Sequence, residues 1–196
     1  MMLTEILSNY RVILASASPR RKFLLSEMGI KFDIVTTDVI EDYDENLHPS
    51  EVAMFLSQKK ASFFSKSNMS DNELIISVDT LVSLNGEIIS KPKDESEAIS
   101  FLQKLSGNMH YVYSGVTLMT KMKQHTFLSE TKVYFRVLEN EEIEYYVAKF
   151  KPFDKAGAYG VQEWIGYVGV ERIEGSFFNV MGLPTTALHK ELLKFL

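Results

Sequence analysis

The sequence predicts an α/β fold built on a mixed β-sheet. Short apolar runs of strand length alternate along the chain with segments whose apolar residues recur at helical spacing, and this alternation favours parallel strands joined by helices. A second observation is the pair Asn85-Gly86 between two β-rich runs, which predicts a tight antiparallel hairpin. Parallel and antiparallel neighbours are therefore both expected in the sheet.

Length and composition set the expected class of protein. The chain has 196 residues, of which 45% are hydrophobic, enough for a single domain over residues 1–196 or for two closely joined lobes. It has no cysteine, which excludes a disulfide framework, a thiol nucleophile and a thiolate metal site. A net charge of −5 argues against a nucleic-acid partner. No apolar stretch is long enough to cross a bilayer and the chain start lacks a signal pattern, so we expect a cytoplasmic protein without a membrane partner.

The first element boundary lies near residue 16. The apolar run 12–15 predicts a buried strand, and the apolar positions that follow, up to Met28, have helical spacing. Ser18 followed by Pro19 is typical of a helix start, with a hydroxyl N-cap and a proline at the first helical position. The sequence therefore predicts a strand that leads directly into a helix.

Two arginines and two serines lie at this predicted boundary. The free backbone N–H groups of a helix start, together with the guanidinium groups of Arg20 and Arg21 and the hydroxyl of Ser16, form a suitable place for phosphate. The alternative is that both arginines only coat the first helical turn. Cations at a helix N-terminus are electrostatically unfavourable, so an anion is expected to compensate them.

The middle of the chain contains an unusual carboxylate. Residues 74–78 and 81–84 are β-rich, and Asp79 lies between them. A carboxylate among such apolar neighbours is costly unless it is paired, hydrogen-bonded or bound to a metal. The alternative is a bulge or turn in which Asp79 faces water. Lys91 follows the return strand of the predicted hairpin, which could bring it back near Asp79.

A helix is predicted from Pro49 onward. Its apolar stripe is formed by Val52, Leu56, Phe63 and Phe64. Lys60 falls on that stripe. Its position alone favours a side chain that extends along the apolar surface to solvent, and the alternative is a side chain that points into a cleft. Residues 38–51 hold six acidic residues and no Lys or Arg, which is typical of a solvated loop, although one or two of these carboxylates could help to hold a divalent cation.

The second half of the chain continues the alternation. We expect a helix that starts with a capping box of Asp94 and Glu97 and ends at Gly107. The further predicted elements are strands 111–120 and 126–137, a helix 141–150, a Gly- and Ala-rich loop 154–162, a strand 177–181, and a last helix from a Thr185 cap through Leu193.

Several motifs together resemble the Maf family over essentially the whole chain from Arg11 onward. The motifs, in order, are Ser-Ala-Ser-Pro-Arg-Arg at 16–21, Lys-Lys-Ala at 59–61, Val-Asp-Thr at 78–80, Lys-Pro at 91–92, Leu-Ser-Gly at 105–107 with His110, Asp-Lys-Ala-Gly-Ala-Tyr-Gly at 154–160, and Gly-Leu-Pro at 182–184. The resemblance implies a nucleoside triphosphate pyrophosphatase that uses a divalent metal, Mg or Mn. It also implies a long mixed sheet with helices on both sides and a central cleft, similar to inosine triphosphatases.

The resemblance also implies residue roles. Asp79 is the expected general base that takes a proton from water, and a metal-ligand role for Asp79 with Glu41 as partner is the alternative. The expected substrate-binding residues are Ser16, Arg20, Arg21, Lys60, Thr80, Lys91 and Gln162. Attack of water at a phosphoryl group requires that the negative charge on the phosphate oxygens is neutralised.

Two positions of the sequence predict which nucleobase the substrate carries. The branch that resembles dTTP and UTP pyrophosphatases has Thr after the catalytic Asp and Gln in the Gly-rich loop, and this chain has Thr80 and Gln162 at these two positions. The branch that prefers 7-methyl-GTP has Gln at the first position and Glu at the second. This chain departs from the pattern with Glu163-Trp164, with Lys151 and with Ser114. The alternatives are a 7-methyl-GTP preference, or a non-catalytic nucleotide-sensing regulator of septum formation. The family further suggests a homodimer and contact with a division protein.

Overall fold

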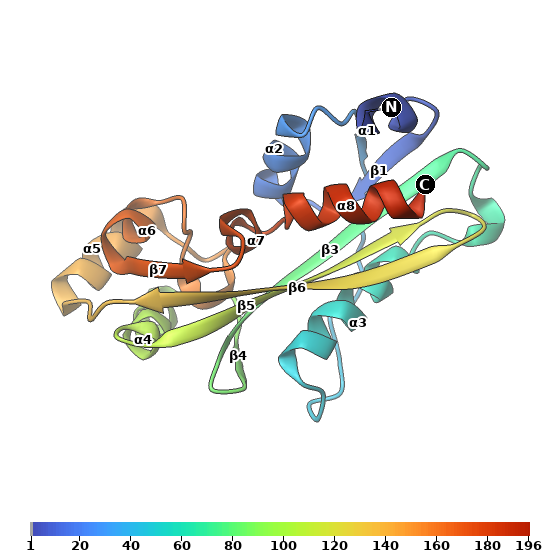
Figure 1. The fold of residues 1–196 in the computed structure, drawn as a ribbon. Coiled ribbons are helices and arrows are strands. Elements are labelled where there is room, and N and C mark those ends of the chain that lie inside the picture. Colours follow the sequence, from blue (N-terminus) through green and yellow to red (C-terminus); the bar gives the residue numbers. More distant parts are fainter. Residues whose placement is uncertain (1) are drawn as a thin grey trace. The chain divides into compact units, whose positions relative to one another are not determined.

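The computed structural model describes residues 2–196 (Figure 1). The helices are α1 (Leu3–Leu7), α2 (Pro19–Glu27), α3 (Pro49–Ala61), α4 (Glu95–Leu105), α5 (Asn140–Phe150), α6 (Trp164–Gly169), α7 (Phe177–Met181) and α8 (Thr185–Phe195), with 3-10 turns η1 (Lys66–Asn68) and η2 (Ala156–Ala158). The strands are β1 (Arg11–Ala15), β2 (Asp33–Ile34), β3 (Glu73–Leu84), β4 (Glu87–Ile89), β5 (Met109–Met119), β6 (Gln124–Phe135) and β7 (Val170–Glu174).

The strands form one mixed sheet, as expected. Its order is β2-β1-β3-β5-β6-β7, with β4 paired to β3. β1 runs parallel to β2 and β3, whereas β4 is antiparallel to β3 and β7 is antiparallel to β6. The α/β class with a mixed sheet is therefore confirmed.

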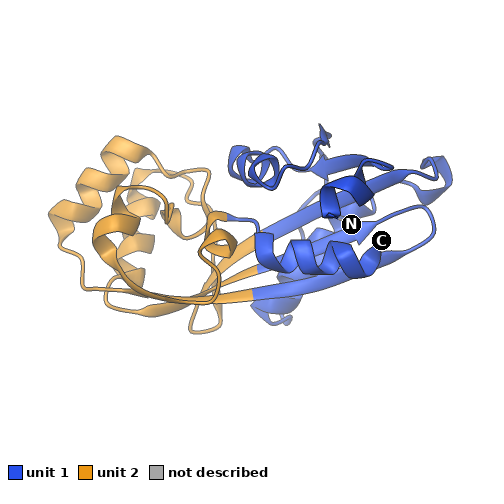
Figure 2. Ribbon diagram, turned by 45° about the horizontal axis from the view of Figure 1, so that its top comes forward, with its two compact units in different colours: residues 1–79, 114–129, 182–196 blue, residues 80–113, 130–181 orange. Residues whose placement is uncertain are grey.

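The chain divides into two compact units (Figure 2). Unit 1 comprises residues 1–79, 114–129 and 182–196, and unit 2 comprises residues 80–113 and 130–181. The long strands β3, β5 and β6 each contribute residues to both units. Asp79 is thus the last residue of its segment of unit 1, and Thr80 is the first residue of unit 2.

Unit 1 is built around β1, whose residues from Val12 to Ala15 are all buried. A strand buried on both faces needs helices on both sides, and Figure 1 shows α1, α2 and α8 on one side of the sheet and α3 on the other. One apolar cluster of this unit contains Ile13, Ala15, Ala61, Met69, Ile75 and Met119.

Unit 2 contains the predicted hairpin and most of the second half of the chain. Asn85 and Gly86 both have positive φ, at 52° and 86°, which matches the turn type that an Asn-Gly pair favours between twisted antiparallel strands. Helices α4 and α5 pack together over this part of the sheet. The core includes Val82, Leu102, Val112, Phe135, Ile143 and Tyr146.

The strand predicted at residues 177–181 is wrong, because this segment forms the short helix α7. Its start is stabilised by Ser176, whose carbonyl accepts from the backbone of Asn179 and whose hydroxyl accepts from the same N–H at 3.3 Å. The Asn179 side chain is buried and donates to the carbonyl of Val112 at 3.1 Å. A polar side chain that is buried through tertiary hydrogen bonds overrides the local strand propensity of Phe and Val.

Smaller differences concern helix ends. Thr185 is the first residue of α8 and not its cap. Asp94 caps α4, but Glu97 accepts from the backbone of Lys93 at 2.6 Å, so the reciprocal bond of a capping box is absent here. Phe63 lies beyond the end of α3 and is 54% exposed, so it is not part of the apolar stripe. Among residues 2–196, no helix combines the length and apolar character needed to cross a membrane.

Candidate active site

The turn from β1 to α2 has the predicted geometry. Ser18 is the N-cap of α2, and its hydroxyl accepts from the backbone N–H of Arg21 at 3.5 Å. The hydroxyl oxygen of Ser16 accepts twice, from the Ser18 backbone N–H at 3.2 Å and from Nη1 of Arg21 at 3.1 Å. Because both bonds use the oxygen of Ser16, its hydroxyl hydrogen can donate to a further acceptor such as a phosphate oxygen.

Arg21 links this turn to the C-terminal segment of unit 1. Its Nε donates to the carbonyl oxygen of Gly182, in the Gly-Leu-Pro motif, at 3.0 Å. Burial is the main cause that lowers the pKa of the Arg21 guanidinium, and Arg20 acts in the same direction. The carboxylates of Asp79 and Glu41 act against this shift, so both lie within electrostatic reach of Arg21.

Arg21→Ala is expected to lower the free energy of unfolding by about 1–3 kcal/mol, because Gly182 and Ser16 lose a charged donor in a partly buried place. Urea denaturation measures this change. Lys22→Ala is the matched control, since Lys22 is exposed on the same helix and should change stability by less than about 0.5 kcal/mol. Equal effects of the two substitutions would contradict the anchoring role of Arg21.

Asp79 lies within a continuous strand. β3 runs without a break from Glu73 to Leu84, so Asp79 lies inside a strand and not at a turn. Asp79 is only 5% exposed, and the alternative in which it faces water is therefore wrong. A buried carboxylate needs a partner, and the structure places one beside it.

That partner is Lys60 on α3. Its ammonium contacts Oδ1 of Asp79 and lies 2.8 Å from Oε1 of Glu41. The Lys60 side chain is only 13% exposed, so the extension to solvent favoured by its position alone is wrong. One partly buried cation thus joins two carboxylates, from β3 and from the loop that precedes α3.

Buried polar contacts hold α3 against the sheet. The backbone carbonyl of Ser57 on α3 accepts a hydrogen bond of 2.6 Å from the hydroxyl of Ser77 on β3. The hydroxyl of Ser57 lies 2.9 Å from the hydroxyl of Thr117 on β5. Gly115 permits this approach, since a Cβ there would lie 2.1 Å from the carbonyl oxygen of Ala53. These contacts place Lys60, one turn beyond Ser57, at the level of Asp79.

The carboxylates of Asp79 and Glu41 fit a divalent metal. Both supply hard oxygen donors, which Mg²⁺ and Mn²⁺ prefer, and both already converge on one cation. Within residues 2–196 no group of three or more His, Cys, Asp or Glu side chains could hold a metal ion. A metal at this pair would therefore complete its coordination with water and substrate oxygens, as is common for Mg²⁺.

The other three predicted site residues belong to unit 2. Thr80 follows Asp79 on β3, Lys91 is exposed two residues beyond β4, and Gln162 lies just before α6. Oε1 of Gln162 is shielded from solvent and has no hydrogen-bond partner within residues 2–196. A buried carbonyl oxygen without a donor is costly, which is typical of a group that awaits a ligand.

Sequence reasoning did not assign roles to Glu163 of unit 2 or to the two residues that hold its carboxylate, Lys155 and Tyr146. The carboxylate of Glu163 lies 3.2 Å from Nζ of Lys155 and accepts from the hydroxyl of Tyr146. Lys155 was visible as part of the Asp-Lys-Ala-Gly-Ala-Tyr-Gly motif, and Glu163 as a departure from the family pattern. No local pattern indicated Tyr146, because its role depends on tertiary packing.

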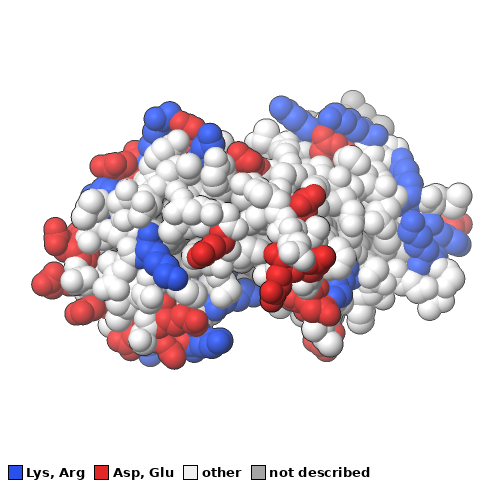
Figure 3. Space-filling model, turned by 90° about the horizontal axis from the view of Figure 1, so that it is seen from below, with Lys and Arg blue, Asp and Glu red and all other residues white. Residues whose placement is uncertain are grey.

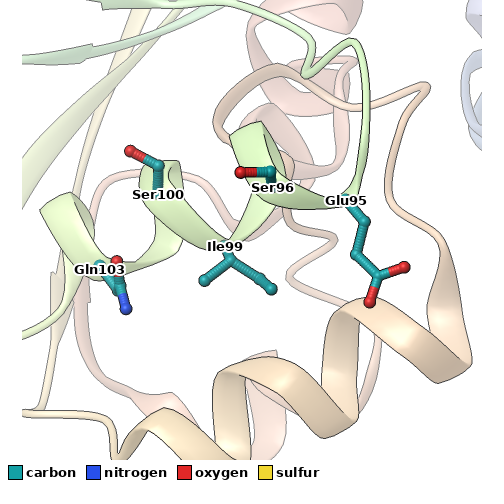
Figure 4. Close-up of a pocket in the computed structure, with 5 residues that line it drawn as sticks. All are labelled: Glu95, Ser96, Ile99, Ser100 and Gln103. Carbon is teal, nitrogen blue, oxygen red and sulfur yellow. The ribbon is translucent and has the colours of Figure 1, made fainter.

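Two properties of the surface are relevant to the predicted site, its pocket and its charge. A cavity of about 490 Å³ runs along α4 and is lined by Glu95, Ser96, Ile99, Ser100 and Gln103, none of them a predicted site residue (Figure 4). On the face shown in Figure 3, Lys and Arg side chains are scattered among Asp and Glu and do not merge into one basic area. On this face, a phosphate would therefore be bound by individual cations and not by a broad basic surface.

The fold and the site define an α/β protein with a mixed sheet, a cation-bearing strand-to-helix turn and a paired buried carboxylate. Its sequence matches the family described as Maf-like protein over residues 11–195. The chain therefore belongs to the Maf-like protein family.

Relatives with high coverage share one activity. The dTTP/UTP pyrophosphatase of Phocaeicola vulgatus is 48% identical over 191 residues, which cover 97% of this chain and 98% of the relative. The dTTP/UTP pyrophosphatase of Parabacteroides distasonis is 46% identical and covers 97% and 99%. The solved Staphylococcus aureus Ham1 protein covers 92% of this chain and 99% of its own, with 19% identity and a TM-score of 0.46, a likeness too low to add to the argument.

Proposed function

We propose that this chain is a nucleoside triphosphate pyrophosphatase that hydrolyses dTTP and UTP to the nucleoside monophosphate and pyrophosphate. The observation that carries the proposal is its identity of 46–48% to dTTP/UTP pyrophosphatases over nearly the whole length of both chains. The residues to which the proposal assigns the chemistry are all present in the sequence, and the hydrogen bonds of Ser16 and Arg21 and the ion pair of Lys60 with Asp79 support it.

In the proposed reaction, water attacks the α-phosphorus of the nucleotide. A bond forms between the water oxygen and this phosphorus, the bond to the oxygen that bridges the α- and β-phosphates breaks, and pyrophosphate leaves. Asp79 takes the proton of the water. Its Oδ1 contacts Lys60, so we assign Oδ2 to the proton. The ion pair with Lys60 holds the carboxylate in one orientation, which general-base catalysis requires.

The cations of unit 1 would bind the phosphates. Arg20, Arg21 and Lys60 supply positive charge, and Ser16 can donate its hydroxyl hydrogen, as can the backbone N–H groups at the start of α2. Lys91 of unit 2 keeps the role of a further phosphate cation that the family resemblance implies. A divalent metal held by Glu41 and Asp79 would neutralise charge on the phosphate oxygens.

The base would be recognised by Thr80 and Gln162. Uracil and thymine present an N–H at N3 between two carbonyl oxygens, and the unpartnered Oε1 of Gln162 is suited to accept from such an N–H. Adenine has no ring N–H on its pairing edge, so ATP would leave the buried oxygen without this donor. A homodimer and a division-protein contact stay predictions of the family resemblance, and a cytoplasmic location stays a prediction of the sequence.

A panel of nucleotides tests the proposed function. With Mg²⁺ or Mn²⁺ present, kcat/KM for dTTP and UTP should exceed that for ATP, GTP and 7-methyl-GTP by at least about tenfold, because a site that hydrogen-bonds one base edge rejects another. Pyrophosphate release measures the rates, and chelation of the metal should abolish them. A preference for 7-methyl-GTP would refute the base assignment alone, whereas binding without turnover would favour the non-catalytic regulator.

A further inference from the structure

The carboxylate of Glu163 is fixed from both sides within unit 2. Its Oε1 lies 3.2 Å from Nζ of Lys155, which also contacts Asp154 at 2.7 Å. Its Oε2 accepts from the hydroxyl of Tyr146, and that hydroxyl accepts from the backbone N–H of Gly160 at 3.0 Å. Lys155 is 8% exposed and Tyr146 is fully buried, whereas the Glu163 side chain is 20% exposed, so the carboxylate is held by two buried groups.

Gly160 brings this carboxylate next to Gln162. A Cβ at position 160 would lie 2.8 Å from Cδ of Glu163 and 3.0 Å from Nε2 of Gln162, so both groups approach the same point beside the glycine. A negative charge favours the N–H end of a neighbouring carboxamide over its oxygen end. Nε2 is the atom of the Gln162 carboxamide that lies beside Gly160 together with Glu163, and Oε1 has no hydrogen-bond partner within residues 2–196.

We propose that Glu163, held by Lys155 and Tyr146, orients the carboxamide of Gln162 and is thereby a positioning residue for pyrimidine selectivity. The inference rests on the proposed function, since it takes Gln162 as the residue that contacts the base. With the amide fixed, Oε1 accepts the N3–H of uracil or thymine. Cytosine presents an unprotonated N3 at the same place, and only an amide that turns by half a rotation could pair with it.

The test is the ratio of kcat/KM for UTP to that for CTP. Glu163→Gln keeps the shape and the bond from Tyr146 but removes the charge, and Tyr146→Phe keeps the ring packing against Phe150 but frees the carboxylate. Each of these two substitutions should lower the UTP/CTP ratio of kcat/KM by roughly three- to tenfold, which corresponds to the free energy of one hydrogen bond. The change should come mainly from a lower KM for CTP. Tyr167→Phe is the matched control, because it removes the same hydroxyl from an 80% exposed site on α6 and should leave the ratio unchanged.

The ratio separates positioning from a merely structural role, which would lower kcat/KM for both nucleotides by the same factor. Such an equal fall, or an unchanged ratio in folded Glu163→Gln, would overturn the proposal. Calorimetric binding of the non-hydrolysable α,β-methylene analogues of UTP and CTP gives the same ratio without turnover. The wild-type ratio in this assay tests the proposed function, and the change in the ratio between wild type and variant tests the positioning.

Discussion

Asp79→Asn is expected to lower kcat by roughly two to four orders of magnitude, because an amide cannot accept the proton from water. The fold should persist, since Asn occupies nearly the same volume and Lys60 keeps its contact with Glu41. Substrate binding should change much less than turnover, because the phosphate cations of α2 and α3 remain. Steady-state kinetics with UTP, together with equilibrium binding of a non-hydrolysable analogue, measure the two effects separately.

Asp71→Asn is the matched control, because Asp71 is a 90% exposed carboxylate that forms a surface ion pair with Lys121. It should leave kcat within about twofold of wild type. A metal titration of Asp79→Asn distinguishes the two roles of this residue. Partial recovery of turnover at high Mn²⁺ would indicate a metal ligand, whereas turnover that stays low at every concentration supports the general base. Near-normal kcat in the folded variant would refute both roles.

Lys60→Met is expected to be the most destabilising of the substitutions considered. It leaves the carboxylate of Asp79, which is 5% exposed, without the ammonium that compensates it. Loss of one partner of a buried ion pair costs about 3–5 kcal/mol, and the nearby Arg21 should keep the cost at the lower end of that range. Urea denaturation at neutral pH measures the loss, and kcat/KM for UTP should fall as well.

Two further variants check the cause of this destabilisation. In the double variant Lys60→Met with Asp79→Asn, no unpaired charge is left on β3, so stability should partly recover relative to Lys60→Met alone. Lys59→Met is the control, since its partner Asp42 is largely exposed and such surface pairs contribute at most about 1 kcal/mol. If the double variant were less stable than Lys60→Met, the Lys60–Asp79 pair could not be the source of the loss.

Local sequence patterns were reliable where a structure depends on residues a few positions apart. Ser18 and Pro19 predicted the start of α2, and Asn85 with Gly86 predicted the turn between β3 and β4, because the capping bond and the positive φ angles arise within a few residues. The same locality made Arg20 and Arg21 visible as cations at a helix start. The strand predicted at 177–181 was wrong for the converse reason, since its helix is stabilised by a buried Asn179 that bonds to distant strands.

The sequence by itself therefore determined the α/β class, the strand-to-helix turn with its cations, and an acid that had to be paired if buried. Only the tertiary structure decided what pairs it. Lys60 and Asp79 are nineteen residues apart in the chain and meet because α3 docks on the sheet at Gly115. The network of Tyr146, Lys155 and Glu163 likewise exists only in the folded unit 2. The physical reason is that caps and turns act over a few residues, whereas the partner of a buried charge is set by which elements pack together.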